Sequence, residues 1–269
     1  MHIPTTTVNL QQVKYPQICL GLQGAPGTGK TYSALTFPNP IVLDIDNGLT
    51  RFGGTDLTTV PVFDHDWCCN LANGKYKPKK QGQTPDRMSI IEDFLLEEAM
   101  KMSDQQTLII DSWSSLQDAF DQEQNLPHRV VKRMTKTGEE DKFKFWDEKI
   151  KYSKRILSLV RSLKCHVIVT FHELQVRHPD TGVLLDKVAP LMQGKFVAEL
   201  KRFFTDWFRV VNEETRDATK KNVVSTQYFW QIRPDNQCDT KTRLNVPDGT
   251  YRVEPHYKIF EQYGYNGIK

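Results

Sequence analysis

The chain has 269 residues, of which 26% are charged and 38% are hydrophobic, and its formal net charge is only +3. This length suits one large α/β domain or two small ones, with enough apolar residues for a sizeable core. The small net charge excludes an overall field that would by itself require a nucleic-acid partner, so such a partner must be argued from local patches.

The cysteines and the apolar runs indicate the cellular compartment. Cysteines stand at positions 19, 68, 69, 165 and 238, and none forms a C-x-x-C pair, so neither a zinc site nor a disulfide framework is expected. The N-terminal stretch is polar, and no apolar run approaches the length of a membrane span. We therefore expect a cytoplasmic protein.

Apolar runs and helical periodicity predict the elements of the first half of the chain. They are a strand at 17–22, a helix that begins at Lys30 and ends near Pro38, a strand at 40–46, a helix at 89–102 with Ser89 as N-cap, and a strand that opens 107–116. A basic loop is expected at 73–83, where four lysines cluster.

The second half of the chain is predicted to be richer in strands. The expected elements are a helix with Trp146, Ile150, Leu157 and Val160 on one face, strands at 165–171, 206–211 and 223–232, a long loop at 174–198, and a turn at Asp248-Gly249. Short apolar strands that alternate with helices predict an α/β fold with a mostly parallel sheet, extended here by C-terminal antiparallel strands. We expect one domain over 17–269, preceded by an N-terminal arm at 1–16.

The stretch "GAPGTGKT" at 24–31 matches G-x-x-x-x-G-K-[S/T] in full, between a predicted strand and a predicted helix. Successive backbone N–H groups in such a loop wrap a phosphate chain, and glycine lets the backbone approach it closely. A chance glycine turn is the alternative. The expected nucleotide-binding residues are Gly24, Ala25, Pro26, Gly27, Thr28, Gly29, Lys30, Thr31 and Tyr32. Lys30 is expected to reach the β- and γ-phosphates, and the Thr31 hydroxyl to ligate Mg²⁺.

Hydrolysis requires carboxylates at the ends of neighbouring strands. Asp111 follows three apolar residues in "LIID" and is the candidate that positions Mg²⁺, with the N-cap of the next helix as its alternative role. Asp44 and Asp46 end "VLDID", and Asp46 is the preferred base for water, with loop capping as the alternative. His172 follows the strand "VIVTF" and is expected to sense the γ-phosphate, or else to be a structural histidine.

The motifs "GAPGTGKT", "IVLDID", "LIIDSWSSL", "VIVTFHE" and "KTRLNVPDG" occur in this order, and together they resemble the phage-encoded RecA-like ATPases, minimal recombinases thought to act in single-strand annealing. The resemblance spans roughly 17–250. It implies a RecA-like fold, ATP and Mg²⁺ as ligands, a ring or filament of subunits in the host cytoplasm, and single-stranded DNA as partner, with single-strand-binding protein as a further candidate. The family usually places Glu where Asp46 stands, which puts the hydrolysis rate in question.

The resemblance also implies roles for residues outside the P-loop. Lys241 and Arg243 would reach the nucleotide of a neighbouring subunit, or else form an exposed basic turn. A first DNA loop is expected at 126–138, where Arg129, Lys132, Arg133 and Lys136 would neutralise phosphates. The loop at 174–198 and the basic loop at 73–83 are further candidates. Trp146 lies near the first loop, but core packing is its expected role.

Two other functions remain open at this stage. A P-loop kinase would use 126–138 as an arginine-rich lid over the phosphates, although the late K-x-R fits that class less well. An ATP-gated helicase loader or accessory module would bind nucleotide without strong turnover, which the aspartate at position 46 leaves possible. We expect a DNA-stimulated ATPase of the recombinase type.

Overall fold

A computed structural model describes residues 17–46, 48–49, 58–61, 87–124, 134–135, 138–139, 141–178, 180–192, 196–217 and 222–264. The predicted N-terminal arm at 1–16 and the basic loop at 73–83 lie outside these residues. The same holds for the four candidate DNA-binding residues Arg129, Lys132, Arg133 and Lys136.

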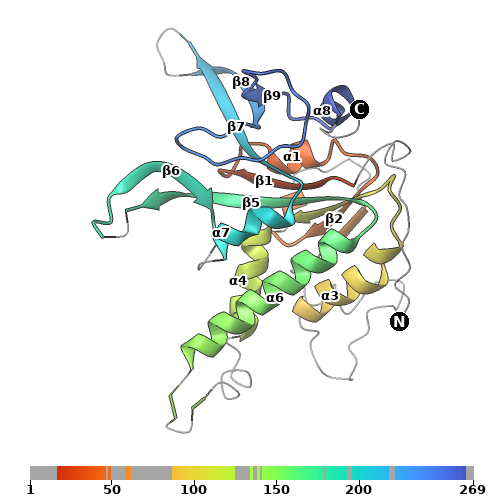
Figure 1. The fold of residues 1–269 in the computed structure, drawn as a ribbon, viewed down its shortest axis with the longest axis vertical. Helices are drawn as coiled ribbons and strands as arrows, with labels where there is room; N and C mark the ends of the chain where they lie inside the picture. The colour runs from red at the N-terminus through yellow and green to blue at the C-terminus, as the bar shows by residue number, and fades with distance from the viewer. Residues whose placement is uncertain are drawn as a thin grey trace, which may run out of the picture.

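Strands and helices alternate through the first two thirds of the chain (Figure 1). The elements are β1 (Cys19–Gly24), α1 (Lys30–Ala34), β2 (Pro40–Asp44), β3 (Thr58–Pro61), α3 (Arg87–Glu97), η3 (Ala99–Lys101), β4 (Thr107–Asp111), α4 (Trp113–Gln124), α6 (Lys142–Ser162), β5 (His166–Arg177), β6 (Leu184–Pro190), α7 (Val197–Leu200), η4 (Lys201–Phe203), β7 (Asp206–Arg216), β8 (Val223–Gln231), β9 (Arg252–Val253) and α8 (Lys258–Tyr263).

The described strands form one sheet in the order β3-β2-β4-β5-β1-β7-β8-β9, with β6 paired to β5 outside this path. The first six strands in this order, β3, β2, β4, β5, β1 and β7, run parallel to one another. Strands β8 and β9 continue the sheet in antiparallel pairs. The predicted fold class, an α/β fold with a mostly parallel sheet and C-terminal antiparallel strands, is therefore confirmed. Parallel strands bring their carboxyl ends to one edge, which is where ligands bind in such sheets.

Two apolar cores cover the two faces of the sheet. Helices α3, α4 and α6 pack on one face, around side chains such as Trp113, Phe171 and Trp207. Helices α1 and α8 cover the other, around Leu22 and Trp230. Figure 1 shows the first group of helices below the sheet and the second above it. Burial on both faces explains why the central strands are continuous apolar runs in the sequence.

Helix α1 has only five residues, and the C-terminal third of the chain anchors it. Trp230 Nε1 of β8 donates a hydrogen bond to Ser33 Oγ of α1 at 3.2 Å. The backbone N of Tyr257 donates to Thr36 Oγ1, just beyond the helix, at 3.0 Å. Because isolated helices this short are not stable in water, these tertiary contacts hold the start of α1 in place.

Two element predictions are wrong. Ser89 is not an N-cap but lies inside α3, which begins at Arg87, because Met88 is already buried in the core. The segment 174–198 is not one long loop: β5 continues to Arg177 and pairs antiparallel with β6. This hairpin projects from the body of the molecule (Figure 1), and its largely exposed strands lack the apolar run that would have predicted them.

Trp146 is not a core residue, because 38% of it is exposed. The N-terminal turns of α6, to which Trp146 belongs, extend beyond the sheet (Figure 1). Further along the same helix, Leu157 and Val160 are buried as predicted. In the part of the chain that the structure describes, no helix is both long and apolar enough to span a bilayer.

Candidate active site

The loop between β1 and α1 has the backbone that an anion cradle requires. Gly27 and Gly29 adopt left-handed conformations, with φ of 80° and 87°. A Cβ on Gly24 would lie 2.8 Å from the carbonyl oxygen of Val210, closer than real Cβ contacts come. The Thr28 hydroxyl donates to the carbonyl of Ala25 at 2.8 Å and closes the turn. Side chains would therefore disrupt the loop at three of its positions.

Lys30 points back into this loop. Its Nζ donates hydrogen bonds to the carbonyl oxygens of Gly24 at 2.9 Å and Ala25 at 2.8 Å, and only 6% of the residue is exposed. Burial lowers the pKa of Lys30, and the negative charges of Asp111, Glu173 and Asp46 oppose that shift. Two carbonyl dipoles stabilise the buried ammonium, and a phosphate anion would stabilise its charge further. The loop is therefore a suitable triphosphate site.

Thr31 and Asp111 meet beside the loop. Thr31 Oγ1 donates to Asp111 Oδ2 at 2.7 Å, and Thr170 of β5 donates to the other carboxylate oxygen. Burial raises the pKa of Asp111, while the hydrogen bonds from Thr170 and Thr31 lower it, and burial prevails. The N-cap alternative for Asp111 does not apply, because the hydroxyl of Ser112 accepts from Ser115 N at the start of α4.

This hydroxyl and carboxylate suit Mg²⁺. Mg²⁺ keeps several water ligands and is bound by one or two protein oxygens together with substrate phosphates. Among the described residues, no three or more His, Cys, Asp or Glu side chains gather as a metal cage would require. The Thr31 hydroxyl and the buried Asp111 carboxylate therefore fit a cation that arrives with a nucleotide.

Asp46 and His172 lie in contact. His172 Nε2 is 3.3 Å from Asp46 Oδ2, while Asp46 Oδ1 accepts from the backbone N of Ser112 at 3.2 Å and from its hydroxyl at 3.1 Å. Burial alone would raise the pKa of Asp46, but hydrogen bonds from His172, Ser115 and Ser112 outweigh it and leave the pKa below its ordinary value. The carboxylate is therefore ionised at neutral pH and held from two sides.

Asp44 has a different role from Asp46. It is buried at the end of β2, and its two carboxylate oxygens accept from the backbone N–H groups of Gly48 and Leu49. This is loop capping, the alternative that the sequence left open for Asp46. The strand thus ends in one structural aspartate and one aspartate that faces the site.

Thr170, Ser112 and Tyr228 also lie at the site, although no sequence motif assigns them a role there. Thr170 faces Asp111 because β4 and β5 are neighbours, which only the strand order reveals. The ring of Tyr228 in β8 covers Gly29, where a Cβ would lie 3.2 Å from the ring. Its only sequence signal is an aromatic position in a late, partly exposed strand.

A partly buried polar network lies next to the loop. Glu173 and Arg209 form a two-fold ion pair, with 3.1 Å from Nε to Oε2 and 3.1 Å from Nη2 to Oε1. Gln23, directly before Gly24, accepts a hydrogen bond from Trp207 Nε1 and lies 3.5 Å from Glu173. Strands β1, β5 and β7 are therefore tied together at the height of the loop.

Lys241 and Arg243 lie away from this loop. Lys241 pairs with Trp207 near the start of β7, whereas the loop follows the opposite end of β1. The Lys241 ammonium donates to the carbonyl of Phe204 at 2.7 Å, and Arg243 is exposed. Neither residue belongs to the site of its own chain, and a role in a neighbouring subunit stays a prediction.

The comparison with protein families agrees with the site. The family model described as "AAA domain" matches residues 17–244, which is most of the chain and includes every residue of the P-loop. No curated protein matches.

Three solved structures are similar to this chain at low sequence identity. They are the RadB recombinase (10% identity, 81% of this chain and 88% of that one, TM-score 0.37), the flagellar accessory protein FlaH from Methanocaldococcus jannaschii (14%, 86% and 86%, 0.36) and a KaiC-like protein from Pyrococcus horikoshii OT3 (12%, 89% and 91%, 0.37).

Proposed function

Because this chain belongs to the AAA domain family of P-loop NTPases, we propose that it hydrolyses ATP in response to single-stranded DNA, as a RecA-like recombination or annealing protein. The family implies ATP and Mg²⁺ as ligands. The single observation that carries the proposal is the assembly of Lys30, Thr31, Asp111 and Asp46 around one glycine loop. The DNA substrate rests on the motif order that resembles phage-encoded recombinases.

In this proposal the loop and Lys30 bind the triphosphate, and Lys30 offsets charge on its β- and γ-phosphates. Thr31 and Asp111 would hold Mg²⁺, which would supply positive charge next to the phosphates. Asp46 orients water and accepts its proton. His172 links Asp46 to β5, whose continuation is the projecting hairpin, so a change at the γ-phosphate is passed to that hairpin.

A ring or filament of subunits belongs to the same proposal. Lys241 and Arg243 are too far from their own P-loop to act there, so we assign them to the nucleotide of a neighbouring subunit. Cations supplied by a neighbour stabilise charge in the transition state of phosphoryl transfer. Turnover would then depend on assembly, and single-stranded DNA that organises the subunits would increase it.

The experiment is phosphate release from ATP·Mg²⁺ with and without poly(dT). The expected result is slow turnover that poly(dT) increases, with no turnover in Lys30→Ala. Equal rates with and without poly(dT) would overturn the DNA part of the proposal. Turnover by Lys30→Ala at the wild-type rate would overturn the assignment of the site.

One observation favours a second function, an ATP-gated accessory module such as a helicase loader. Ser112 and His172 already contact both carboxylate oxygens of Asp46. Aspartate is also one methylene shorter than the glutamate that is usual in the RecA-like ATPases whose motif order this sequence resembles. The same assay separates the two functions. Tight ATP binding in calorimetry without phosphate release under any condition would favour the module.

A further inference from the structure

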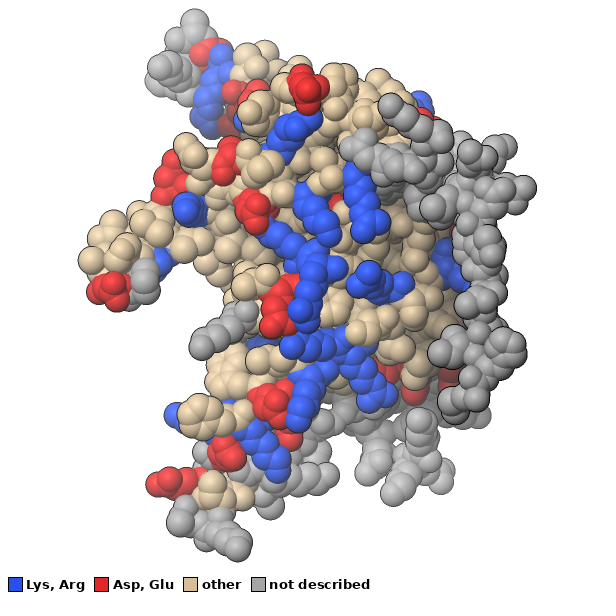
Figure 2. Space-filling view, viewed as in Figure 1, with Lys and Arg blue, Asp and Glu red and all other residues tan. Residues whose placement is uncertain are grey.

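A basic stripe runs down one face of the molecule (Figure 2). It crosses α6, η4 and the segment after β8, and it is defined here by Lys154, Arg161, Lys201, Arg202, Lys241 and Arg243. The stripe joins residues from three separate parts of the chain. Such a gathering of one charge on one face points to an anionic partner more strongly than a single basic loop does.

Contacts place the members of the stripe next to one another. Glu199 of α7 bridges Lys154, at 3.1 Å, and Arg202, at 2.9 Å. The ammonium of Lys241 lies 3.5 Å from the carbonyl oxygen of Lys201. The elements α6, α7, η4 and 241–243 therefore form one continuous surface.

The negative charges within the stripe do not balance it. Glu199 and Asp239 pair with Lys154, Arg202 and Lys201. The buried Asp206 lies next to the 241–243 segment, where its carboxylate accepts from the backbone N of Arg243. These are three acidic residues against the six basic residues of the stripe. Within the described part of the chain, Arg161 and Arg243 are exposed and form no ion pair. Burial lowers the pKa of Lys241, and the nearby charges of Arg243 and Arg161 lower it further, while the charge of Asp206 opposes this shift. Binding of an anion would reduce the electrostatic repulsion between these positive side chains.

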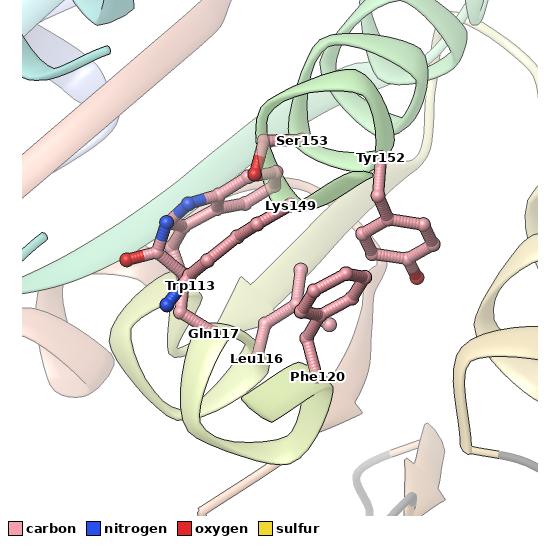
Figure 3. A pocket seen from close by; sticks show the side chains of 7 residues that line it. All are labelled: Trp113, Leu116, Gln117, Phe120, Lys149, Tyr152 and Ser153. Carbon is pink, nitrogen blue, oxygen red and sulfur yellow. The ribbon is translucent and has the colours of Figure 1, made fainter. Parts of the chain in front are cut away.

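The opposite face of α6 behaves differently. Lys149 points toward α4 and pairs with Asp121 at 2.8 Å, beside a small recess lined by Trp113, Gln117 and Ser153 (Figure 3). That recess is filled by side chains, and its lysine is satisfied. The basic residues available to a partner on α6 are those of the outer face.

We propose that the basic stripe binds the phosphate backbone of a nucleic-acid strand, in addition to any contact made by the predicted loops. The stripe crosses three elements, so it suits an extended polyanion with regularly spaced charges better than a single triphosphate. The strand is proposed to lie over Lys154, Arg161, Lys201 and Arg202, because Lys241 and Arg243 at the end of the stripe are assigned to the nucleotide of a neighbouring subunit. These four residues lie outside the P-loop of their own chain, so its ATP site is free while a strand is bound. The proposal rests on the proposed function, since both name single-stranded DNA.

The test compares Arg161→Gln/Arg202→Gln with Lys101→Gln/Lys258→Gln. Both pairs remove two exposed positive charges, but Lys101 and Lys258 lie in η3 and α8, outside the stripe. Binding of labelled poly(dT) is measured by anisotropy over a salt series. Each phosphate contact contributes roughly 0.7 to the salt slope for a single strand, so the stripe variant should lose about 1.4 and bind more weakly. The control should match the wild type, and all three proteins should keep the same DNA-free ATPase rate.

The outcomes separate this proposal from the proposed function. If the wild type binds poly(dT) and the stripe variant has the wild-type affinity and slope, the stripe proposal is wrong while the function stands. If the wild type does not bind poly(dT) at all, both are wrong. Equal losses in the stripe and control variants would mean that only net charge matters, which also overturns the stripe as a site.

Discussion

His172 Nε2 lies 3.3 Å from Asp46 Oδ2, and the two residues are 126 positions apart in the sequence. Asp46 follows β2 and His172 belongs to β5, and β4 separates these strands in the sheet. The contact forms because parallel strands end at a common edge. The proposed base and the proposed γ-phosphate sensor are therefore in direct contact, so a substitution of either residue should alter the position of the other.

Asp46→Asn should reduce kcat for ATP by roughly 10²- to 10⁴-fold, the usual contribution of a positioned base, with little change in ATP affinity. His172→Gln keeps a side-chain donor near Asp46 and should lose less activity than His172→Ala. Steady-state phosphate release and calorimetry check both statements. An Asp46→Asn variant with wild-type kcat would remove Asp46 from catalysis.

Asp111→Asn should lose roughly 10- to 100-fold in Mg²⁺-dependent activity, because the carboxylate next to Thr31 is removed. Its effect on stability depends on pH. The pKa of Asp111 is raised in the folded state, so its stabilising contribution is present below the unfolded pKa of about 3.9 and is lost as pH rises through the folded pKa. Relative to the wild type, the variant should therefore be more stable at pH 7 than at pH 4.

Urea denaturation of both proteins at these two pH values measures that difference. The shift should be present without nucleotide, because it comes from the buried carboxylate itself. A difference in stability that stays constant with pH would show that Asp111 is not buried as an acid with a raised pKa.

Gly29→Ala should be more harmful than Gly249→Ala. Both glycines have positive φ, 87° and 83°, so alanine costs about 1–2 kcal/mol at either position. At Gly29, however, the new Cβ also meets Tyr228, whereas nothing lies within 4 Å at Gly249. Chemical denaturation and ATP titration compare the two, and only Gly29→Ala should lose ATP affinity. Adding Tyr228→Ala to Gly29→Ala should restore part of the lost stability; no recovery would argue against the ring contact.

Replacing only one partner of the Glu173–Arg209 ion pair should lower the free energy of unfolding more than replacing both. The two side chains are 9% and 14% exposed, so Arg209→Met would leave a buried carboxylate unpaired and cost about 3–5 kcal/mol. The double variant Glu173→Leu/Arg209→Met removes both charges and should be much closer to the wild type in a denaturant titration. Equal losses in the single and double variants would contradict this account.

Mixing two inactive proteins tests the shared active site. Lys30→Ala lacks a working P-loop, and Lys241→Ala/Arg243→Ala lacks the proposed contribution to a neighbour. If subunits share sites, an equimolar mixture should be more active than either protein alone, and wild-type specific activity should rise with concentration. A mixture no more active than the sum of its parts would rule out this role for Lys241 and Arg243.

The sequence predicted the P-loop and the central strands well because both depend on local pattern. Gly27 and Gly29 need left-handed backbone wherever the motif occurs, and buried parallel strands such as β4 and β5 are uniformly apolar. The α/β class and the antiparallel C-terminal strands followed from the same runs.

The remaining features depend on which strands are neighbours, which no local pattern contains. Thr170 reaches Asp111, and Tyr228 covers Gly29, only because of the strand order. The hairpin of β5 and β6 was missed because its strands are held by backbone pairing rather than by burial. Trp146 fits the apolar stripe of α6 in sequence but lies beyond the sheet that the stripe packs on.

The anchoring of α1 by Trp230 and Tyr257 makes nucleotide binding dependent on two residues that lie far along the chain from the glycine loop. A truncation before Trp230 would leave the glycine loop, Lys30, Thr31 and Asp111 in the chain, yet it would remove both contacts that anchor the short helix on which Lys30 and Thr31 stand. Shortened versions of this protein should therefore lose affinity for ATP, even though the deleted residues lie more than half the chain away from Lys30.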